Sequence, residues 1–388
     1  MINFSLVLIA KNEAQSLPRM LGCLQEYATL PGHDLIMVDT GSTDNTVEMA
    51  IKHGFNVTSV GARFVEHLTQ EETSQLNRDY IIADDPPIDF TQDGIFHFAN
   101  ARNFAASLAQ HNYVFMPDCD EELDPFVIAE VIEAVKTGVG EITCDYIWSR
   151  NQHGKPDVFF ERSRFYDRQQ MRWEGMIHEA LFWNTSGITK HLPSSVLKIN
   201  HHQIGDNIRS TRDLKGLLLD CKKNPNNDRN AHYCGRQLLW CGRPRSAIKQ
   251  LTAHINMSKW DAERAQSWIY IGEAYKQLNL PVNEYDAYQN AIKLDPNRRT
   301  PWLKMSEYHH RYNRPQLCAC YASAALAIRK RSGFYMERES EYTYEPHDLL
   351  YWAHWNLGNK MEAKHHWQQA KESDPNNPRY IHDARFFD

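Results

Sequence analysis

Two short apolar runs near the N-terminus, each followed at once by polar residues, most constrain the fold of this chain. Residues 4–10 read FSLVLIA and residues 35–38 read LIMV. Apolar runs of this length without polar alternation are typical of strands that are buried on both faces in a parallel sheet. Apolar residues at helical spacing over 14–28, a helix expected over 45–53 and a possible third strand over 56–60 complete the pattern. This alternation predicts an α/β layer with right-handed crossovers.

The α/β region is expected to extend to about residue 205. Residues 61–95 are acidic and look like an insertion or a long loop. The elements expected after it are a helix over 100–110, a short buried strand over 113–116, strands with alternating polarity over 141–148 and 158–166, a loop leading into a helix over 173–182, and a late strand over 196–200.

From about residue 207 the pattern changes to continuous amphipathic helix. Trp268, Gly272, Tyr288, Ala291 and Pro296 fit the spacing of a tetratricopeptide repeat, and weaker copies follow the same frame before and after them. Small residues at two of these positions would let helices approach, while aromatic residues fill the groove. We therefore expect residues 1–205 to form the α/β domain and residues 206–388 a helical solenoid, the alternative being an ordinary helical bundle.

Composition excludes several classes of protein. The chain has 388 residues, enough for two domains, and is 42% hydrophobic and 24% charged, which argues against disorder. No apolar run approaches the roughly 20 residues of a membrane span, and the N-terminus lacks the basic segment of a signal peptide. Eight cysteines without a regular framework indicate reduced thiols in a cytoplasmic protein rather than a disulfide scaffold or a zinc ribbon.

Charge is distributed unevenly along the chain. The first 205 residues carry 15 Lys and Arg against 28 Asp and Glu, whereas the remainder carries 28 against 21. An acidic half that could hold a divalent cation is thus joined to a half that could attract an anion. The alternative is that these charges lie on solvated helix faces.

Two acidic sites follow predicted strands. Asp118 and Asp120 come directly after the strand at 113–116, where two acids one residue apart can share a hard cation, unless they form an acidic surface turn. Asp39 ends the second apolar run and could accept hydrogen bonds from a ribose or a base, unless it is a helix N-terminal acid. Because no GxGxxG follows the first strand, a metal at Asp118 and Asp120 would have to hold the phosphates of a nucleotide diphosphate.

Two further clusters could take part in chemistry. Residues 173–179, WEGMIHE, combine an aromatic ring, two carboxylates and an imidazole. Trp173 with a neighbouring carboxylate is a common sugar-binding pair, and Glu174 or Glu179 could act as a general base, although spacing does not rank them. His201 and His202 follow the late strand and could complete a metal shell, the alternative being structural histidines.

Taken together, these segments resemble the family 2 glycosyltransferases of GT-A fold, and more narrowly the members that fuse this domain to tetratricopeptide repeats. The matching motifs cover residues 1–205, and the repeat pattern covers the rest. They are Ala10-Lys11-Asn12-Glu13, Val38-Asp39-Thr40-Gly41-Ser42-Thr43-Asp44, Ala101-Arg102-Asn103, Asp118-Cys119-Asp120-Glu121-Glu122 and Trp173-Glu174-Gly175 with His178-Glu179.

The resemblance implies a transferase that uses a nucleotide-sugar donor, usually UDP-linked, together with Mn²⁺ or Mg²⁺. By position, Asn12 and Glu13 belong to the nucleotide-binding first loop and Asp39 contacts the nucleotide. Arg102 faces the donor near its phosphates, and Trp173 is also assigned to the donor site.

The resemblance also assigns the metal ligands. Asp118 and Asp120 form the metal-binding pair, with Asp120 the closer ligand and Asp118 also facing the donor. His201 or His202 matches the late metal-binding histidine of the fold.

In inverting members the general base lies at the start of a helix after the sugar-binding loop, which maps to Glu179 first and to Glu174 second. The base would take a proton from the acceptor, which attacks the anomeric carbon from the face opposite the nucleotide, while the metal and Arg102 offset charge on the departing diphosphate. Two departures stand out. Residues 61–95 exceed the usual connection, and the base is Glu in a His-Glu pair where many members have Asp.

The acceptor stays open at this point. The first hypothesis is a hexosyl- or pentosyltransferase whose repeats recruit a glycan, a lipid-linked group or a protein. The second is the same chemistry on nucleic acid, such as a hydroxymethylated DNA base, because the helical half contains Arg298-Arg299 and Arg329-Lys330-Arg331. The third is a non-catalytic repeat scaffold with a relic transferase domain.

Overall fold

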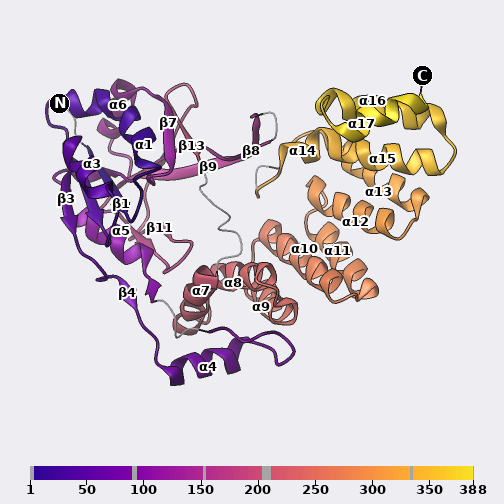
Figure 1. The fold of residues 1–388 in the computed structure, drawn as a ribbon, viewed down its shortest axis with the longest axis horizontal. Coiled ribbons are helices and arrows are strands. Elements are labelled where there is room, and N and C mark those ends of the chain that lie inside the picture. The colour runs from indigo at the N-terminus through magenta and orange to yellow at the C-terminus, as the bar shows by residue number, and fades with distance from the viewer. Residues whose placement is uncertain (1–3, 90–93, 152–153, 203–210, 333–334, 388) are drawn as a thin grey trace. The chain divides into compact units, whose positions relative to one another are not determined.

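The computed structural model describes residues 4–89, 94–151, 154–202, 211–332 and 335–387. The chain divides into two compact units (Figure 1). We call Met1–Asn77 with Ile88–Lys223 the strand domain, and Arg78–Pro87 with Asn224–Asp388 the helical domain. The domain boundary predicted after residue 205 lies outside the described residues.

The strand domain is built on a mixed sheet with the strand order β3-β2-β1-β6-β9-β8-β13-β7, to which β12 adds beside β8. Its strands are β1 (Phe4–Ala10), β2 (Leu35–Asp39), β3 (Asn56–Ser59), β6 (Tyr113–Phe115), β7 (Glu121–Phe126), β8 (Glu141–Arg150), β9 (Pro156–Asp167), β12 (Thr189–Leu192) and β13 (Leu197–His201). The predicted strands at 4–10, 35–38, 56–60, 113–116, 141–148, 158–166 and 196–200 are confirmed within two residues at each end.

The first strands run parallel, so their carboxyl ends meet at one edge of the sheet. β1 pairs with β2 and with β6 in parallel register, for example Leu6 with Leu35 and with Phe115. Both faces of β1 are buried, because Leu6 and Leu8 point into one hydrophobic cluster and Val7 into another. This two-sided burial explains the uninterrupted apolar run in the sequence.

Helices cover both faces of the sheet. α1 (Leu17–Cys23) and α6 (Ile128–Lys136) contribute to the cluster on one face, and α5 (Phe98–Ser107) contributes to the cluster on the other. The remaining elements of this region are α2 (Gln25–Thr29), α3 (Thr46–Lys52), β4 (Val65–Glu66), α4 (Gln70–Tyr80), β5 (Ile95–Phe96), β10 (Met171–Glu174), β11 (Ala180–Trp183) and α7 (Thr211–Lys223).

Two segments differ from the sequence-based expectation. The helix predicted at the end of 173–182 is wrong: β10 and β11 pair as an antiparallel hairpin in this part of the chain. The acidic stretch after β6 is not only a turn, because β7 pairs with β13 and buries Glu121 completely. Residues 61–95, expected as an insertion, contain the short β4–β5 pair and α4 in their described part.

The helical domain consists of antiparallel helices packed in sequence, as expected for tetratricopeptide-like repeats. They are α8 (Asp228–Trp240), α9 (Pro244–Met257), α10 (Asp261–Gln277), α11 (Pro281–Leu294), α12 (Arg299–Arg311), α13 (Pro315–Ala327), α14 (Glu339–Tyr342), α15 (Tyr344–Asn356), α16 (Lys360–Ser373) and α17 (Pro378–Asp383), with a 3-10 helix at Ala384–Phe386. A Cβ on Gly272 would lie 2.3 Å from Cε1 of Tyr288. The expectation that a small residue here lets α10 and α11 approach is therefore confirmed.

None of the eight cysteines, all of which lie in the described ranges, forms a disulfide. In the described ranges, none of the helices has both the length and the apolar character that crossing a bilayer requires.

Candidate active site

Two loops at the carboxyl edge of the sheet are joined by hydrogen bonds. Asn12, after β1, has a left-handed backbone (φ 59°), and its Oδ1 accepts a hydrogen bond from the N–H of Thr43 at 2.7 Å. In return, the N–H groups of Asn12 and Glu13 donate to the hydroxyls of Ser42 and Thr46, at 2.9 and 2.7 Å. The structure thus brings the predicted first loop and the segment after β2 together.

Asp39 ends β2, but its carboxylate is engaged in the turn that follows. The residue is 4% exposed, and its Oδ1 accepts a hydrogen bond from the N–H of Ser42 at 2.9 Å. Gly41 supplies the positive φ (101°) that the turn requires. Asp39 therefore shapes the loop at which the sequence predicted the nucleotide.

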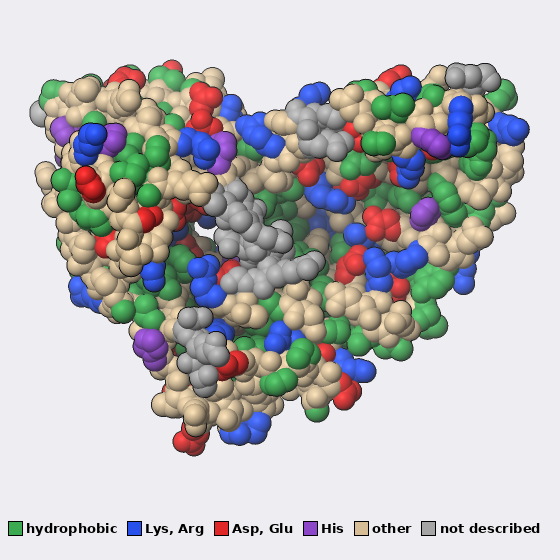
Figure 2. All heavy atoms as spheres, viewed as in Figure 1, with side chains coloured by type: hydrophobic (Ala, Val, Ile, Leu, Met, Phe, Trp, Pro, Cys, Tyr) green, Lys and Arg blue, Asp and Glu red, His purple; other side chains and the backbone are tan. Residues whose placement is uncertain are grey.

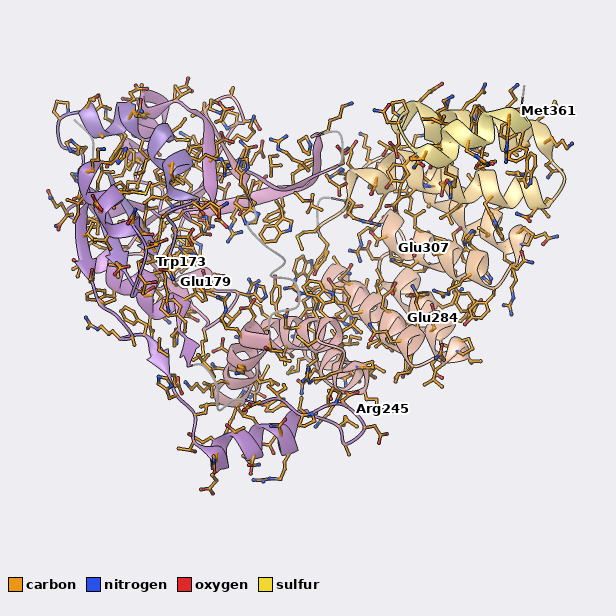
Figure 3. The ribbon with its side chains drawn as sticks, in the orientation of Figure 1. Trp173, Glu179, Arg245, Glu284, Glu307 and Met361 are labelled. Atoms are coloured by element: carbon orange, nitrogen blue, oxygen red, sulfur yellow. The ribbon has the colours of Figure 1, made fainter. Side chains whose placement is uncertain are left out.

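Asp118 is the centre of a buried ion-pair network. Arg102, on α5, donates from Nη2 to Asp118 Oδ1 at 2.5 Å and from Nε to Glu179 Oε1 at 2.7 Å. Arg164, on β9, is fully buried and pairs with the other carboxylate oxygen of Asp118 and with Glu121. Three carboxylates and two guanidinium groups are therefore linked in one continuous cluster (Figure 3 labels Glu179).

The charges in this network stabilise one another against the cost of burial. Burial alone would raise the pKa of Asp118, but Arg102 and Arg164 hold it well below its usual range. Burial opposes the charge on Arg102, yet Asp118 and Glu179 raise the pKa of this guanidinium. Burial raises the pKa of Glu121 in spite of the opposing effect of Arg164. Asp118 is thus a fixed anion whose two oxygens already hold guanidinium groups.

Asp120 lies beside this network, together with His201 at the end of β13 and His202 directly after it. His201 Nε2 is 3.3 Å from Asp120 Oδ2, and the His201 ring stacks on Trp148 with centroids 4.5 Å apart. Burial lowers the pKa of His201, but the carboxylate of Asp120, the carbonyl group of Trp148 and the charge of Glu121 together outweigh it, so the pKa is raised. His202 instead contacts Glu122, at 2.8 Å. Of the two predicted histidines, the structure brings His201 to Asp120.

Several carboxylates gather here. Burial raises the pKa of Glu13, and the carboxylates of Asp120, Asp118 and Asp44 raise it further. Mutual repulsion of this kind is relieved by a cation. A carboxylate and an imidazole in contact, with a further carboxyl group nearby, form a donor set that suits Mn²⁺ and accepts Mg²⁺ through its oxygens. The residues present therefore fit a divalent ion, with Asp120 and His201 as its first ligands.

The predicted WEGMIHE segment contains the last two residues of β10 and the turn that leads to β11. Gly175 (φ 97°) and His178 (φ 54°) have left-handed backbones that let the chain reverse. Asp220, on α7, accepts hydrogen bonds from the N–H groups of Met176 at 2.6 Å and Ile177 at 3.4 Å. α7 therefore fixes the position of this turn within the strand domain.

The two candidate bases lie in different surroundings. Glu179 has a side chain that is 10% exposed and joins the network through Arg102. Glu174 has a side chain that is 41% exposed and pairs with Arg172 at 2.5 Å. The structure brings Glu179, and not Glu174, into the cluster around Asp118.

Trp173 is a buried support rather than an open platform for a sugar. It is 4% exposed, and its Nε1 donates to the hydroxyl of Tyr166 at 3.0 Å. The guanidinium of Arg102 lies over its ring, 4.8 Å from the centroid. Asn103 makes two hydrogen bonds to its backbone, at 2.9 and 3.0 Å. The ring thus positions Arg102.

Sequence reasoning missed Arg164, Glu121 and Asp220. Arg164 lies within a strand that was predicted from alternating polarity. A charged residue directly before two aromatic residues in this strand was the one sign that it could be buried. Its partners stand 43 and 46 positions earlier in the chain, so no local pattern joins them. Asp220 lies in a helix that reads as ordinary amphipathic sequence.

Three arginines of the basic runs that motivated nucleic-acid binding have partners within the helical domain, whereas Arg329 and Lys330 are exposed. Arg298 is fully buried and pairs with Asp295, and Arg299 is 5% exposed and donates to backbone carbonyl groups. Arg331 pairs with Glu339. On the face drawn in Figure 2, basic and acidic side chains are mixed over the helices. The placement of these arginines therefore does not support the expectation of a DNA-binding surface.

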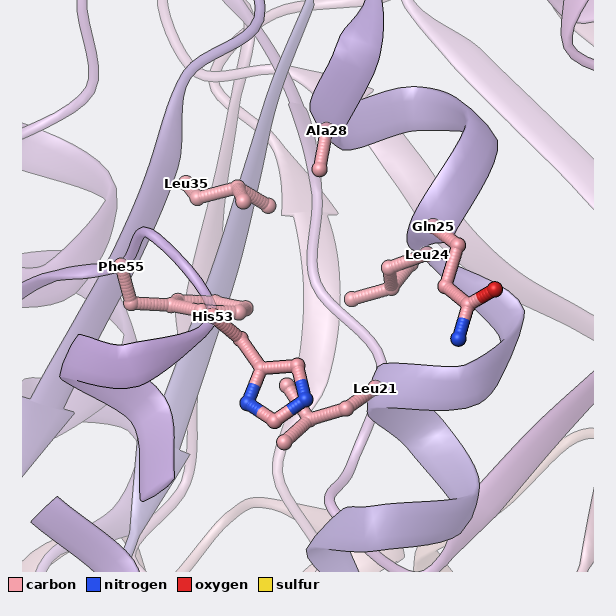
Figure 4. A pocket seen from close by; sticks show the side chains of 7 residues that line it. All are labelled: Leu21, Leu24, Gln25, Ala28, Leu35, His53 and Phe55. Atoms are coloured by element: carbon pink, nitrogen blue, oxygen red, sulfur yellow. The ribbon is translucent and has the colours of Figure 1, made fainter. Parts of the chain in front are cut away.

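A small cavity of about 220 Å³ lies elsewhere in the strand domain (Figure 4). Its lining is mostly apolar and includes Leu35, the first residue of β2, and Phe55. Because Asp39 is at the opposite end of the same strand, this cavity is separate from the acidic edge.

One family model matches the N-terminal part of the chain. Residues 5–60 and 68–192 match the model "Glycosyl transferase family 2". No curated protein matches the sequence. Solved structures with similarity include MamA protein (16% identity, 44% of this chain and 85% of that chain, TM-score 0.35) and a thermophilic TPR protein of Thermus thermophilus (15%, 44% and 86%, TM-score 0.34). Pseudomonas aeruginosa pilF is similar at 13% identity over 45% of this chain and 73% of that chain, with a TM-score of 0.37.

Proposed function

We propose that this chain, whose N-terminal domain matches the family 2 glycosyl transferases, is an inverting glycosyltransferase that uses a nucleotide-sugar donor and Mn²⁺ or Mg²⁺. The observation that carries the proposal is the meeting of Asp120, His201 and the Arg102–Asp118–Glu179 network at the carboxyl ends of β1, β2 and β6. Ligand sites of open α/β sheets form at this edge. The acceptor we propose is a glycan, a lipid-linked group or a protein, recruited with the help of the helical domain.

The chemistry is divided among residues of the site. A bound divalent ion, held by Asp120 and His201, would supply positive charge next to the diphosphate of the donor. Asp118 keeps Arg102 in place, so that a fixed guanidinium is available near the donor phosphates when negative charge develops on the leaving group. The loops after β1 and β2, with Asn12 and Asp39, form the wall against which we place the nucleoside.

Glu179 is the base that we assign to the acceptor. Arg102 Nε binds its Oε1, which orients the carboxylate, and we assign Oε2 to the acceptor proton. Removal of this proton lets the acceptor oxygen, nitrogen or sulfur attack the anomeric carbon from the face opposite the nucleotide. The bond to the diphosphate breaks as the new glycosidic bond forms, so the configuration inverts.

Release of free nucleotide from a panel of UDP- and GDP-sugars tests the proposal. We expect release that requires Mn²⁺ or Mg²⁺, stops with a chelator and is lost in Asp120→Asn. Glu48→Gln, an acid-to-amide change on the exposed surface of α3, is the matched control and should leave release unchanged. A chain that releases no nucleotide from any donor, with every acceptor class present, would be a scaffold with a relic domain.

The base is tested by a matched pair of variants. Glu179→Gln should lower kcat by about 10²- to 10⁴-fold with little change in donor affinity, because it removes proton transfer and keeps the side-chain shape. Glu174→Gln should stay within a few-fold of the parent. The reverse result would assign the base to Glu174.

A further inference from the structure

Three buried polar side chains from consecutive helices meet inside the helical domain. His232 on α8, His254 on α9 and Glu263 on α10 each offer a ligand atom within 4.8 Å of those of the other two. Both histidines are fully buried, and Glu263 is 6% exposed. A carboxylate in such a place is costly unless it is paired or bound to a metal. The arrangement therefore needs a chemical reason.

Each of these residues has a further polar contact. His254 Nε2 is 3.1 Å from Glu263 Oε2. The hydroxyl of Ser267, also on α10, lies 2.8 Å from Nδ1 of both His232 and His254. His232 Nε2 is 2.9 Å from the hydroxyl of Tyr335. One serine thus holds both imidazole rings, whose centroids are 4.9 Å apart.

The shared serine is an arrangement that metal-binding histidines also show. For His232 to bind a metal through Nε2, the hydroxyl of Tyr335, now 2.9 Å from that nitrogen, has to give way to the ion. A ligating imidazole usually donates its other ring N–H to a fixed acceptor, and the two lone pairs of one hydroxyl oxygen can accept both Nδ1–H groups. Two imidazoles and one carboxylate are a donor set of zinc sites. In a tetrahedral site with bonds of about 2.1 Å, ligand atoms lie about 3.4 Å apart, which the His254–Glu263 contact already approaches.

We propose that the helical domain contains a divalent transition-metal site, best suited to zinc, in which His232, His254 and Glu263 are ligands and Ser267 positions both histidines. The site joins α8, α9 and α10 and is independent of the acidic edge of the strand domain, where Asp120 and His201 suit Mn²⁺ or Mg²⁺. The three ligands come from three helices and leave the fourth position of the ion to a water molecule. The role that we propose is to hold these helices together.

Cobalt is the probe that reports on this site directly. Full-length protein carrying Asp120→Asn and His201→Gln is stripped with a chelator, so that the other metal-binding corner is removed, and is titrated with Co²⁺ and then Zn²⁺. We expect one equivalent of Co²⁺ with the visible absorption of a four- or five-coordinate ion, displaced by Zn²⁺. Ser267→Ala should weaken the affinity about 10- to 100-fold and Glu263→Gln at least about 100-fold.

Thermal unfolding provides a second readout. At Zn²⁺ about one hundred times above the dissociation constant, the midpoint of the helical domain should rise by about 5–10 °C, and the rise should disappear in Glu263→Gln. His365→Gln, which changes an exposed histidine on α16, is the matched control and should keep both the absorption and the shift.

Other results overturn the proposal. Without a metal, all these contacts can be hydrogen bonds. The donors and acceptors then form an unbroken line from Tyr335 through His232, Ser267 and His254 to Glu263, and the cluster is a buried polar network that binds no ion. That outcome gives no Co²⁺ absorption and no Zn²⁺-dependent shift in the stripped parent, or equal binding in Glu263→Gln. If Glu263→Gln does not fold, Ser267→Ala and the comparison of parent protein with and without chelator decide between the two.

Discussion

Replacing Arg164 by methionine tests whether the ion-pair network under the candidate active site is as important as its burial indicates. The change keeps the volume of the side chain and removes its charge. Arg164 and Glu121 are both fully buried, and each lacks contact with bulk water that could compensate for the loss. Breaking one partner out of such a buried pair costs about 3–5 kcal/mol, and Asp118 would keep only Arg102.

A double variant separates two contributions to this cost: the lost attraction between Arg164 and Glu121, and the burial of an unpaired carboxylate. In Arg164→Met with Glu121→Gln the uncompensated carboxylate is gone, so we expect the double variant to regain about 2 kcal/mol relative to the single one. Arg172→Met is the matched control: its side chain is 59% exposed and pairs with Glu174 outside the network, so its loss should cost less than about 1 kcal/mol.

The assay must report on the strand domain alone, because the chain has two compact units. Urea unfolding followed by hydrogen exchange and mass spectrometry, read on peptides covering β6, β7 and β9, meets this need. A cost below about 1 kcal/mol for Arg164→Met, or no recovery in the double variant, would refute the view that this network organises the site.

Three further changes have defined outcomes. Gly272→Ala should destabilise the helical domain by about 1–3 kcal/mol in chemical unfolding, because the new Cβ would lie 2.3 Å from the Tyr288 ring. Burial, reinforced by a nearby arginine, lowers the pKa of His309 to about 4, so the unfolded chain takes up a proton first as pH falls below about 6.5. Stability of the helical domain should therefore drop by about 2–3 kcal/mol between about pH 6.5 and 4, and His309→Phe should remove this part of the pH dependence. Asp220→Ala should lower kcat with donor affinity unchanged, because the N–H of Met176 loses its acceptor and the hairpin turn that carries the base loosens; equal kcat would contradict this.

The parts of the fold that could be predicted are those in which the polarity of neighbouring residues in the sequence matches their burial in the structure. β1 and β2 are buried on both faces, so their apolar runs identify them, and the helical domain shows its close helix contacts through Gly272 and Tyr288. The Asp118-x-Asp120 pattern was informative because it follows a buried strand.

The rest depends on partners distant in sequence. β10 and β11 have four residues each, too few for an alternation to stand out, and the turn between them depends on Asp220, which comes later in the chain. Glu121 reads as part of an acidic turn because its compensating charge, Arg164, is on another strand. Arg298 and Arg299 read as a basic surface because the groups that bury them lie elsewhere in the helical domain.

Equilibrium binding of UDP, with GDP as the second probe, tests the central claim that a divalent ion at Asp120 and His201 holds the diphosphate of the donor. Calorimetry with wild type and Asp120→Asn, each in Mn²⁺ and in chelator, gives the four values required. The account predicts tight binding only for the wild type in Mn²⁺. The affinity should be at least a hundredfold lower for the wild type in chelator and for Asp120→Asn in either condition. Nucleotide binding of equal strength in chelator, or in Asp120→Asn, would contradict it.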